Sequence, residues 1–305
     1  MKKYRSVFAT ILSAVALAGC AGGIQGKGMT DSPSAPPTLE QIGRAQVTGI
    51  YDGKPITLNN GTFEGAPFVE GGAAHPTVEL LGRLTASADL DNLPGEESAV
   101  LLAESSAGSG INVYLAVFGL QNGAAKNLGT ILVGNRVQTR GLGLTDGVIV
   151  LDVVQAGPQE AMCCPTQLAR RSYRLEPSGL KQVASEVVGT LSLEAIAGIE
   201  WTLEQMQGRP LAQGSMAPTF KVAGSTASGF GGCNRYSGSI KEGSPREIAL
   251  GMMISTKMAC PEPQMSLEDQ FLVELSLVTS YSFLNGQLAL GWKDGNRNGV
   301  LVFRR

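Results

Sequence analysis

The chain has 305 residues, and its 24 Lys and Arg against 26 Asp and Glu give a formal net charge of −2 at pH 7. It has no basic cluster of the kind that nucleic-acid binding requires. Beyond its N-terminus it has no apolar stretch near the roughly 20 residues of a membrane-spanning helix. It contains 40 glycines, and short β-branched runs alternate with Gly, Asn and Asp. This pattern predicts many strands joined by tight turns, so we expect a mostly β (α+β) protein.

The first twenty residues have the features of an export signal. Three basic residues within the first five precede an apolar run at 7–17, which is too short to span a bilayer but fits a secretory signal peptide. The run ends in Leu17-Ala18-Gly19-Cys20, which resembles the lipobox of bacterial lipoproteins. We therefore predict a lipoprotein signal peptide at 1–19 and a lipid on Cys20. The alternative is an ordinary signal peptide cut near Ala21, with Cys20 discarded.

Residues 20–38 are rich in Gly, Ser and Pro and lack an apolar period, so we predict a lipidated, flexible tether. Residues 39–190 are predicted to form an antiparallel, β-rich envelope domain of unknown function. Its expected elements are a short helix at 40–45, a hairpin at 47–51 and 55–58, and strands at 99–103, 113–118, 130–133 and 148–154. Asn-Gly and Asp-Gly pairs predict the turns, at Asn60-Gly61, Asn122-Gly123 and Asp146-Gly147.

Residues 191–305 are predicted to form a second domain. Apolar residues alternate with polar ones at 199–203 and 220–222, which predicts half-buried strands. Residues 265–279 predict one amphipathic helix, with Ser266 as its N-cap and with Glu268 and Asp269 in its first turn. Its expected apolar face is Leu267, Phe271, Leu272, Leu275 and Val278. Strands are then expected at 281–284, 287–292 and 300–303, with turns at Asn285-Gly286 and 294–299.

Four cysteines besides Cys20 allow three disulfide pairings, and an exported protein meets an oxidising compartment. The pairing of Cys233 with Cys260 lies within one predicted domain, and closing a loop of about 28 residues would contribute on the order of 3 kcal/mol. It leaves Cys163 beside Cys164. A vicinal bridge there is strained, because adjacent Cα atoms lie about 3.8 Å apart, and two reduced, buried thiols are the alternative. A zinc site is disfavoured because the spacing lacks two C-x-x-C arms.

Two motifs in the second domain resemble those of a known family. They are Gly231-Gly232-Cys233-Asn234-Arg235-Tyr236-Ser237-Gly238 and, further along, Ile254-Ser255-Thr256-Lys257-Met258-Ala259-Cys260-Pro261. With the helix that follows, they resemble the META domain, or HslJ-like heat-shock lipoprotein family, over about 195–305. The resemblance implies a small β-barrel-like fold with one helix, an outer-membrane or periplasmic location, and an association with stress or drug tolerance. It implies no catalytic residues. The first domain also resembles a region found in bacterial envelope lipoproteins, but this resemblance implies no function.

Three candidate sites in the sequence also have simpler interpretations. A degenerate calcium-binding loop could use the carboxylates of Asp89, Asp91 and Glu97 as ligands. A solvated acidic turn is the favoured interpretation. Cys233 lacks a neighbouring histidine for nucleophilic catalysis, because the single histidine of the chain, His75, lies in the other domain. Arg235 and Tyr236 have two open alternatives, a structural role or a ligand-facing one.

We therefore expect a non-enzymatic lipoprotein of the cell envelope. It would be held on a membrane, the outer membrane where the organism has one, by its N-terminal lipid. No cofactor and no nucleic-acid partner are expected. The META domain would bind an unidentified envelope protein or a small ligand and support envelope integrity or stress and drug tolerance. The alternatives are a pilot-like assembly factor that escorts an outer-membrane complex and, more remotely, an envelope hydrolase.

Overall fold

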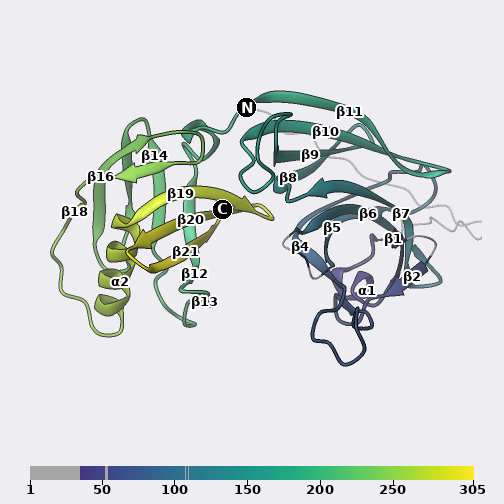
Figure 1. Cartoon of the computed structure of the whole chain (residues 1–305), viewed down its shortest axis with the longest axis horizontal. Coiled ribbons are helices and arrows are strands. Elements are labelled where there is room, and N and C mark those ends of the chain that lie inside the picture. The colour runs from purple at the N-terminus through teal and green to yellow at the C-terminus, as the bar shows by residue number, and fades with distance from the viewer. Residues whose placement is uncertain (1–34, 52–53, 107, 109) are drawn as a thin grey trace, which may run out of the picture. The chain divides into compact units, whose positions relative to one another are not determined.

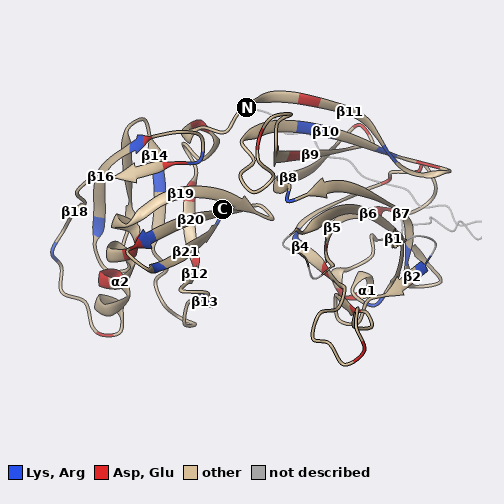
Figure 2. Ribbon diagram, viewed as in Figure 1, with Lys and Arg blue, Asp and Glu red and all other residues tan. Residues whose placement is uncertain are grey.

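The computed structural model describes residues 35–51, 54–106, 108 and 110–305. It is built almost entirely from antiparallel strands (Figure 1), which confirms the expected mostly β class. Among these described residues, none of the helices has the length and apolar character needed to cross a bilayer. Lys and Arg are interspersed with Asp and Glu along the described strands (Figure 2).

The first part of the chain contains one short helix and three sheets. The helix α1 spans Leu39–Ile42, and Thr38 and Gln41 form a reciprocal capping box at its start. The strands β1 and β2 form a hairpin, β3 to β7 a five-stranded sheet and β8 to β11 a four-stranded sheet. The bounds of the strands are β1 Gln46–Tyr51, β2 Lys54–Thr57, β3 Thr62–Glu64, β4 Thr77–Ala88, β5 Glu97–Ser105, β6 Asn112–Gln121, β7 Ala124–Asn135, β8 Gln138–Thr145, β9 Val148–Gln155, β10 Gln167–Glu176 and β11 Gly179–Thr190.

The five-stranded sheet is covered on both faces. Along β5, Ala99 and Leu101 pack into one apolar cluster with residues of the four-stranded sheet. Val100 and Leu102, which point to the opposite face, pack into a second cluster with α1 and the β1–β2 hairpin. A strand that is buried on both faces needs a continuous apolar run rather than an alternating one, and this explains the sequence of β5.

The last part of the chain forms a ten-stranded antiparallel sheet with one helix. The sheet closes on itself, because Glu247 beside β17 bridges to Ser280 of β19 and the Tyr281 N–H donates to the Arg246 carbonyl at 2.9 Å. The elements are the 3-10 turn Leu193–Ala195, β12 Glu200–Met206, β13 Arg209–Pro210, β14 Thr219–Ala223, β15 Thr226–Phe230, β16 Arg235–Glu242, β17 Ile248–Leu250, β18 Ile254–Ser255, α2 Gln264–Ser276, β19 Val278–Leu284, β20 Gln287–Asp294 and β21 Arg297–Arg304.

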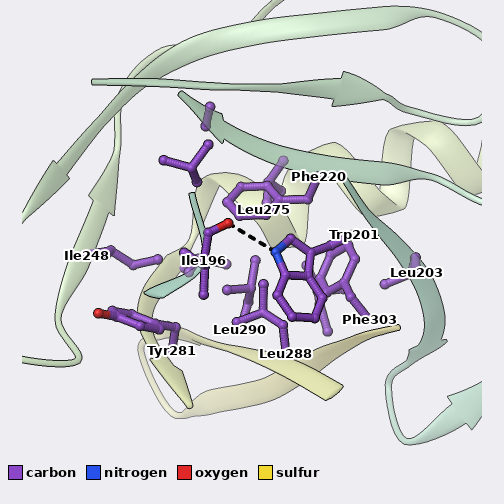
Figure 3. Packing of buried hydrophobic residues seen from close by; sticks show 14 of the residues in the cluster. Ile196, Trp201, Leu203, Phe220, Ile248, Leu275, Tyr281, Leu288, Leu290 and Phe303 are labelled. Atoms are coloured by element: carbon purple, nitrogen blue, oxygen red, sulfur yellow. Dashed lines mark hydrogen bonds between the residues drawn. The ribbon is translucent and has the colours of Figure 1, made fainter. Parts of the chain in front are cut away.

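The interior of this closed sheet is filled by apolar side chains that surround Trp201 (Figure 3). The indole N–H of Trp201 is buried, and it donates a hydrogen bond to the Ile196 carbonyl at 3.2 Å. Phe271 of α2 packs edge-on against Tyr236 and Phe303, with ring centroids 5.8 and 6.4 Å away. The helix therefore closes the interior with an aromatic residue, in the favoured ring geometry.

Hydrogen bonds join the two predicted domains. The Phe283 N–H donates to Gln138 Oε1 at 2.8 Å, and the Gly286 N–H donates to the Thr139 carbonyl at 2.9 Å. In the described chain, no strand of residues 46–190 is paired with a strand of residues 200–304. The strands therefore pair in two separate groups, and the division into two domains at residue 190 stays a prediction.

Most of the predicted turns and several of the predicted strands are confirmed. Asn60, Asn122, Asp146 and Asn285 all have a positive φ in their turns. The sequence analysis missed the strands β3, β4, β8, β10, β11, β13 and β15 to β18. The last hairpin turn is also shorter than expected, because β20 and β21 remain paired as far as Asp294 and Arg297.

The predicted start of the long helix is wrong. Pro263 occupies the N-cap of α2, and Ser266 lies inside the helix. The Ser266 N–H and hydroxyl both donate to the Glu262 carboxylate, at 3.3 and 2.6 Å. An acid before the helix thus supplies the acceptor that Ser266 was expected to provide. The helix also ends earlier than predicted, because Val278 begins β19.

Candidate functional site

The GGCNRYSG motif forms a loop around the carboxylate of Glu268 on α2. Glu268 Oε2 accepts hydrogen bonds from the Cys233 N–H at 2.9 Å and from the Asn234 N–H, and Oε1 accepts one from Asn234 Nδ2 at 2.8 Å. The residue is only 3% exposed. Burial alone would raise the pKa of Glu268, but the hydrogen bonds from Asn234 and Cys233 outweigh it and lower the pKa. The carboxylate is therefore a structural anion that organises the loop.

The two glycines of the motif are required by this close approach. A Cβ on Gly231 would lie 2.7 Å from Glu268 Oε2, which is too near for any side chain. Gly232 has a φ of +126°, a region that disfavours residues with a Cβ. The glycines thus allow the loop to fold against the carboxylate.

Asn234 connects the same loop to the second motif. Its Oδ1 accepts hydrogen bonds from the Thr256 hydroxyl at 2.8 Å and from the Met258 N–H at 2.7 Å, and its Nδ2 also donates to the Met258 carbonyl at 3.2 Å. The predicted disulfide between Cys233 and Cys260 is confirmed, with a Cα–Cα distance of 6.0 Å. The two motifs are therefore joined by hydrogen bonds of the Asn234 side-chain amide and by a disulfide.

The fastened segment carries three large apolar side chains in contact with solvent. Met252 is 89% exposed, Ile254 is 69% exposed and Met258 is 59% exposed. We call these three residues the apolar strip. Arg235 and Lys257, on the adjoining motifs, are also exposed. Clustered exposed apolar side chains often mark interaction sites, and methionine adapts its shape to different partners.

Tyr236, by contrast, does not face a ligand. It is 3% exposed, and its hydroxyl donates to the Thr219 carbonyl at 2.7 Å. Burial raises the pKa of this phenol far above its usual range. Of the two alternatives left open by the sequence, the structural role applies to Tyr236, while Arg235 is left on the surface.

Removing this hydroxyl should weaken the fold only modestly. For Tyr236→Phe we expect the free energy of unfolding to fall by about 1 kcal/mol, because the Thr219 carbonyl loses its donor. Urea unfolding followed by tryptophan fluorescence would measure the change. Tyr281→Phe is the matched control, because the buried Tyr281 hydroxyl has no hydrogen-bond partner within the described structure, and its removal should cost nothing. Equal losses in both variants would contradict the assigned role of Tyr236.

The structure brings Asp89, Asp91 and Glu97 together, with carboxylate oxygens within 4.8 Å of one another. Glu97 is buried and accepts a hydrogen bond from the Leu90 N–H at 2.7 Å, whereas Asp89 and Asp91 cap the turn through the Asn92 and Leu93 N–H groups. Burial raises the pKa of Glu97, and the nearby charges of Asp91 and Asp89 raise it further. These bonds fit an acidic turn in which Asp89 is exposed and Glu97 is buried, and calcium binding stays a prediction.

This environment makes the charge of Glu97 unfavourable. Because its folded pKa is raised, stability should decrease as the pH rises through the range between its unfolded and folded pKa values. We expect Glu97→Gln to raise the free energy of unfolding at pH 7 by roughly 0.5–1 kcal/mol in EDTA, measured by urea unfolding followed by circular dichroism. Glu96→Gln removes a charge of the same sign at the adjacent residue, and it should change the free energy of unfolding little. If calcium instead occupies the turn, added CaCl2 will stabilise the wild type and not Glu97→Gln.

The remaining predicted site residues are placed as follows. Cys163 and Cys164 are both free and exposed, so neither of the two alternatives, a vicinal bridge or a pair of buried thiols, is observed. Cys233 is oxidised and offers no thiol nucleophile. His75 lies 3.3 Å from a Glu64 oxygen. The predicted lipidation site, Cys20, lies outside the described residues.

Comparisons with known proteins match the region that contains both motifs. The META domain family matches residues 194–305, whereas no curated protein matches the chain. One solved NMR structure is 22% identical, and its match covers 37% of this chain and 94% of that chain with a TM-score of 0.31. Another, of a protein from Burkholderia xenovorans, is 26% identical and covers 41% of this chain and 97% of that chain with a TM-score of 0.29.

The matched residues are those of the closed sheet, the helix α2, the Glu268-centred loop and the disulfide-linked segment. The fold expected from the motifs, a small barrel with one main helix, is also the one observed. Residues 194–305 of this chain are a META domain.

Proposed function

We propose that the protein is a non-enzymatic lipoprotein of the cell envelope, anchored through Cys20, whose META domain is a binding module that supports envelope integrity under stress. The observation that carries the binding role is the apolar strip. Three large apolar side chains remain in water on a segment that is fixed by a disulfide and by Asn234. A rigid segment loses little entropy when a partner covers it.

The strip is therefore a preorganised surface rather than a disordered one. Its apolar side chains would contribute favourable burial on contact with a partner. The neighbouring cations Arg235 and Lys257 would favour a partner that has an apolar surface with anionic groups beside it. Support for the non-catalytic role is that Cys233 and Cys260, the two thiols of the motifs, are joined in a disulfide. The lipobox at Cys20 supports the envelope location.

The proposal is tested in a strain that lacks the gene. We expect the strain to lose tolerance to heat or to hydrophobic antibiotics and to regain it with the wild-type gene. A variant with Met252→Ser, Ile254→Ser and Met258→Ser should fail to restore tolerance, although it folds and is exported normally. Cys20→Ser should also fail, because the protein loses its anchor.

The matched control replaces three other exposed apolar residues of the META domain, Val273→Ser, Leu284→Ser and Val300→Ser. It should restore tolerance fully. Wild-type tolerance of the deletion strain in every assay would remove the stress role, and full rescue by the strip variant would remove the strip from the function. Crosslinking that recovers one stoichiometric outer-membrane complex through the strip would favour the pilot-like alternative.

A further inference from the structure

The loop between β9 and β10 presents two adjacent thiols to solvent. Glu160 holds the loop by accepting hydrogen bonds from the Gly157 N–H at 3.1 Å and from the N–H of Thr166 at 2.9 Å, and the Thr166 hydroxyl also donates to it. The Cys164 N–H donates to the Ala161 carbonyl at 3.0 Å. Cys163 and Cys164 are exposed at the tip, and their sulfur atoms lie 2.6 Å apart. The loop is thus a braced turn that holds both sulfurs within reach of each other.

A cation from the META domain lies against one of the two thiols. The Arg246 side chain lies close enough to Cys164 to favour the charged form of its thiol. Arg246 adopts a φ of +76°, an uncommon conformation for a residue with a side chain, and its Nε is buried with no hydrogen-bond partner among the described residues. The hydrogen bond from Cys163 and then the contact with Arg246 lower the pKa of Cys164, while the bond to Cys164 raises the pKa of Cys163. The two thiols therefore differ, and Cys164 forms the thiolate more readily.

The adjacency of Cys163 and Cys164 also determines how a disulfide between them would behave. Neighbouring Cα atoms are about 3.8 Å apart, whereas ordinary disulfides span about 4.4–6.8 Å. The 6.0 Å separation of Cys233 and Cys260 falls inside that range. A bridge between adjacent cysteines is strained, and strained, exposed disulfides are the reducible ones. The chain thus combines one bridge of ordinary span, between the buried Cys233 and the half-buried Cys260, with one exposed pair that is suited to reversible oxidation.

We propose that Cys163 and Cys164 form a thiol–disulfide exchange site that reacts with solvent-accessible disulfides of other molecules. The Cys164 thiolate attacks one sulfur of the incoming disulfide, forms a mixed disulfide and releases one thiolate. Cys163, after losing its proton to solvent, attacks the Cys164 sulfur and releases the second thiolate. The pair is oxidised by two electrons to a vicinal disulfide, and the incoming disulfide is reduced to two thiols. A dithiol reverses the reaction.

The test uses oxidised glutathione as the probe on the full-length protein at pH 7, with products located by peptide mass spectrometry under non-reducing conditions. We expect the wild type to yield the Cys163–Cys164 bridge without a retained glutathione. Cys163→Ser should retain one glutathione on Cys164. Cys164→Ser should react more slowly at Cys163, because the Arg246 side chain favours the thiolate more strongly at Cys164 than at Cys163. Arg246→Gln should slow Cys164 in the same direction, and Arg246→Lys should restore part of the rate.

The Cys233–Cys260 bridge is the internal control, and mild dithiothreitol should open the vicinal bridge before it opens this one. Free Cys163 and Cys164 in excess oxidised glutathione would overturn the proposal, as would a stable glutathione adduct on the wild type. Equal reaction rates for Cys163→Ser and Cys164→Ser would overturn the assignment of Cys164 as the attacking group. All variants lie on the exposed loop or its neighbour, so unchanged tryptophan fluorescence should confirm that they fold.

Discussion

Replacing Glu268 by glutamine is expected to lower the free energy of unfolding by about 3 kcal/mol. The wild-type carboxylate accepts three hydrogen bonds from Cys233 and Asn234 in a site that is 3% exposed. A glutamine has one acceptor oxygen and one amide group that donates. In the same position its amide would face an N–H donor, so at least one buried donor would lose its partner, and charge-assisted bonds would be lost as well.

Urea unfolding followed by tryptophan fluorescence measures this loss well. The two tryptophans of the chain, Trp201 and Trp292, both lie in the buried cluster of the META domain. Asp269→Asn is the matched control, because it makes the same chemical change at the adjacent, exposed position, where substitutions usually change stability by less than about 0.5 kcal/mol. Equal small effects in both variants would contradict the view that Glu268 organises the loop.

The same carboxylate should give the META domain an acid-sensitive component of stability. Its folded pKa is lowered relative to its ordinary value, so its contribution is fully present above the unfolded pKa and is lost as the pH falls through the folded pKa. The stability difference between the wild type and Glu268→Gln should therefore shrink as the pH falls from 7 toward 3. A difference that stays constant over that range would show that the lost bonds do not depend on the charge.

The sequence predicted those parts of the fold in which local pattern and tertiary structure agree. The apolar run of β5 and the Asn-Gly turns signal their conformations locally. The strand β11 was missed because ten of its residues, 181–190, are exposed, so no apolar pattern marks it. The strand β10 was missed because Arg170, Arg171 and Arg174 interrupt its apolar residues. β11 pairs with β10 through a tight hairpin, and β10 also pairs with β9. Pairing with these neighbours, rather than an apolar pattern, determines the conformation of both strands.

The candidate site, too, could be predicted only in part from the sequence. The two motifs identified the family region and the disulfide. They did not reveal that the Glu268 carboxylate accepts the hydrogen bonds of Cys233 and Asn234. Glu268 was assigned to the first turn of a helix, where the helix dipole favours a negative charge. Its burial depends on donors 34 and 35 residues away, and no local pattern encodes such partners. The pairing of the Cys164 thiol with Arg246 was missed for the same reason.

Removing the Cys233–Cys260 disulfide is the second change for which we expect a large effect. The bridge joins residues 27 positions apart, and a loop of this length contributes about 3–4 kcal/mol in the chain-entropy model. We therefore expect the double variant Cys233→Ala, Cys260→Ala to unfold at a lower urea concentration, by tryptophan fluorescence, with a loss of that size. Dithiothreitol should produce a similar shift in the wild type and none in the double variant. Cys163→Ser, Cys164→Ser is the control for exposed thiols, and its unfolding should match that of the wild type.

The two large effects should also interact. The Cys233 N–H is one of the donors to Glu268, so the bridge and the carboxylate hold the same loop. Residues that share a partner do not contribute additively. We expect the triple variant that combines Glu268→Gln with the loss of both cysteines to lose less stability than the sum of the two separate losses, because the second change acts on a loop that has already loosened. A strictly additive result would mean that the carboxylate and the disulfide stabilise separate parts of the META domain, and the single organised loop inferred from their shared contact would then be wrong.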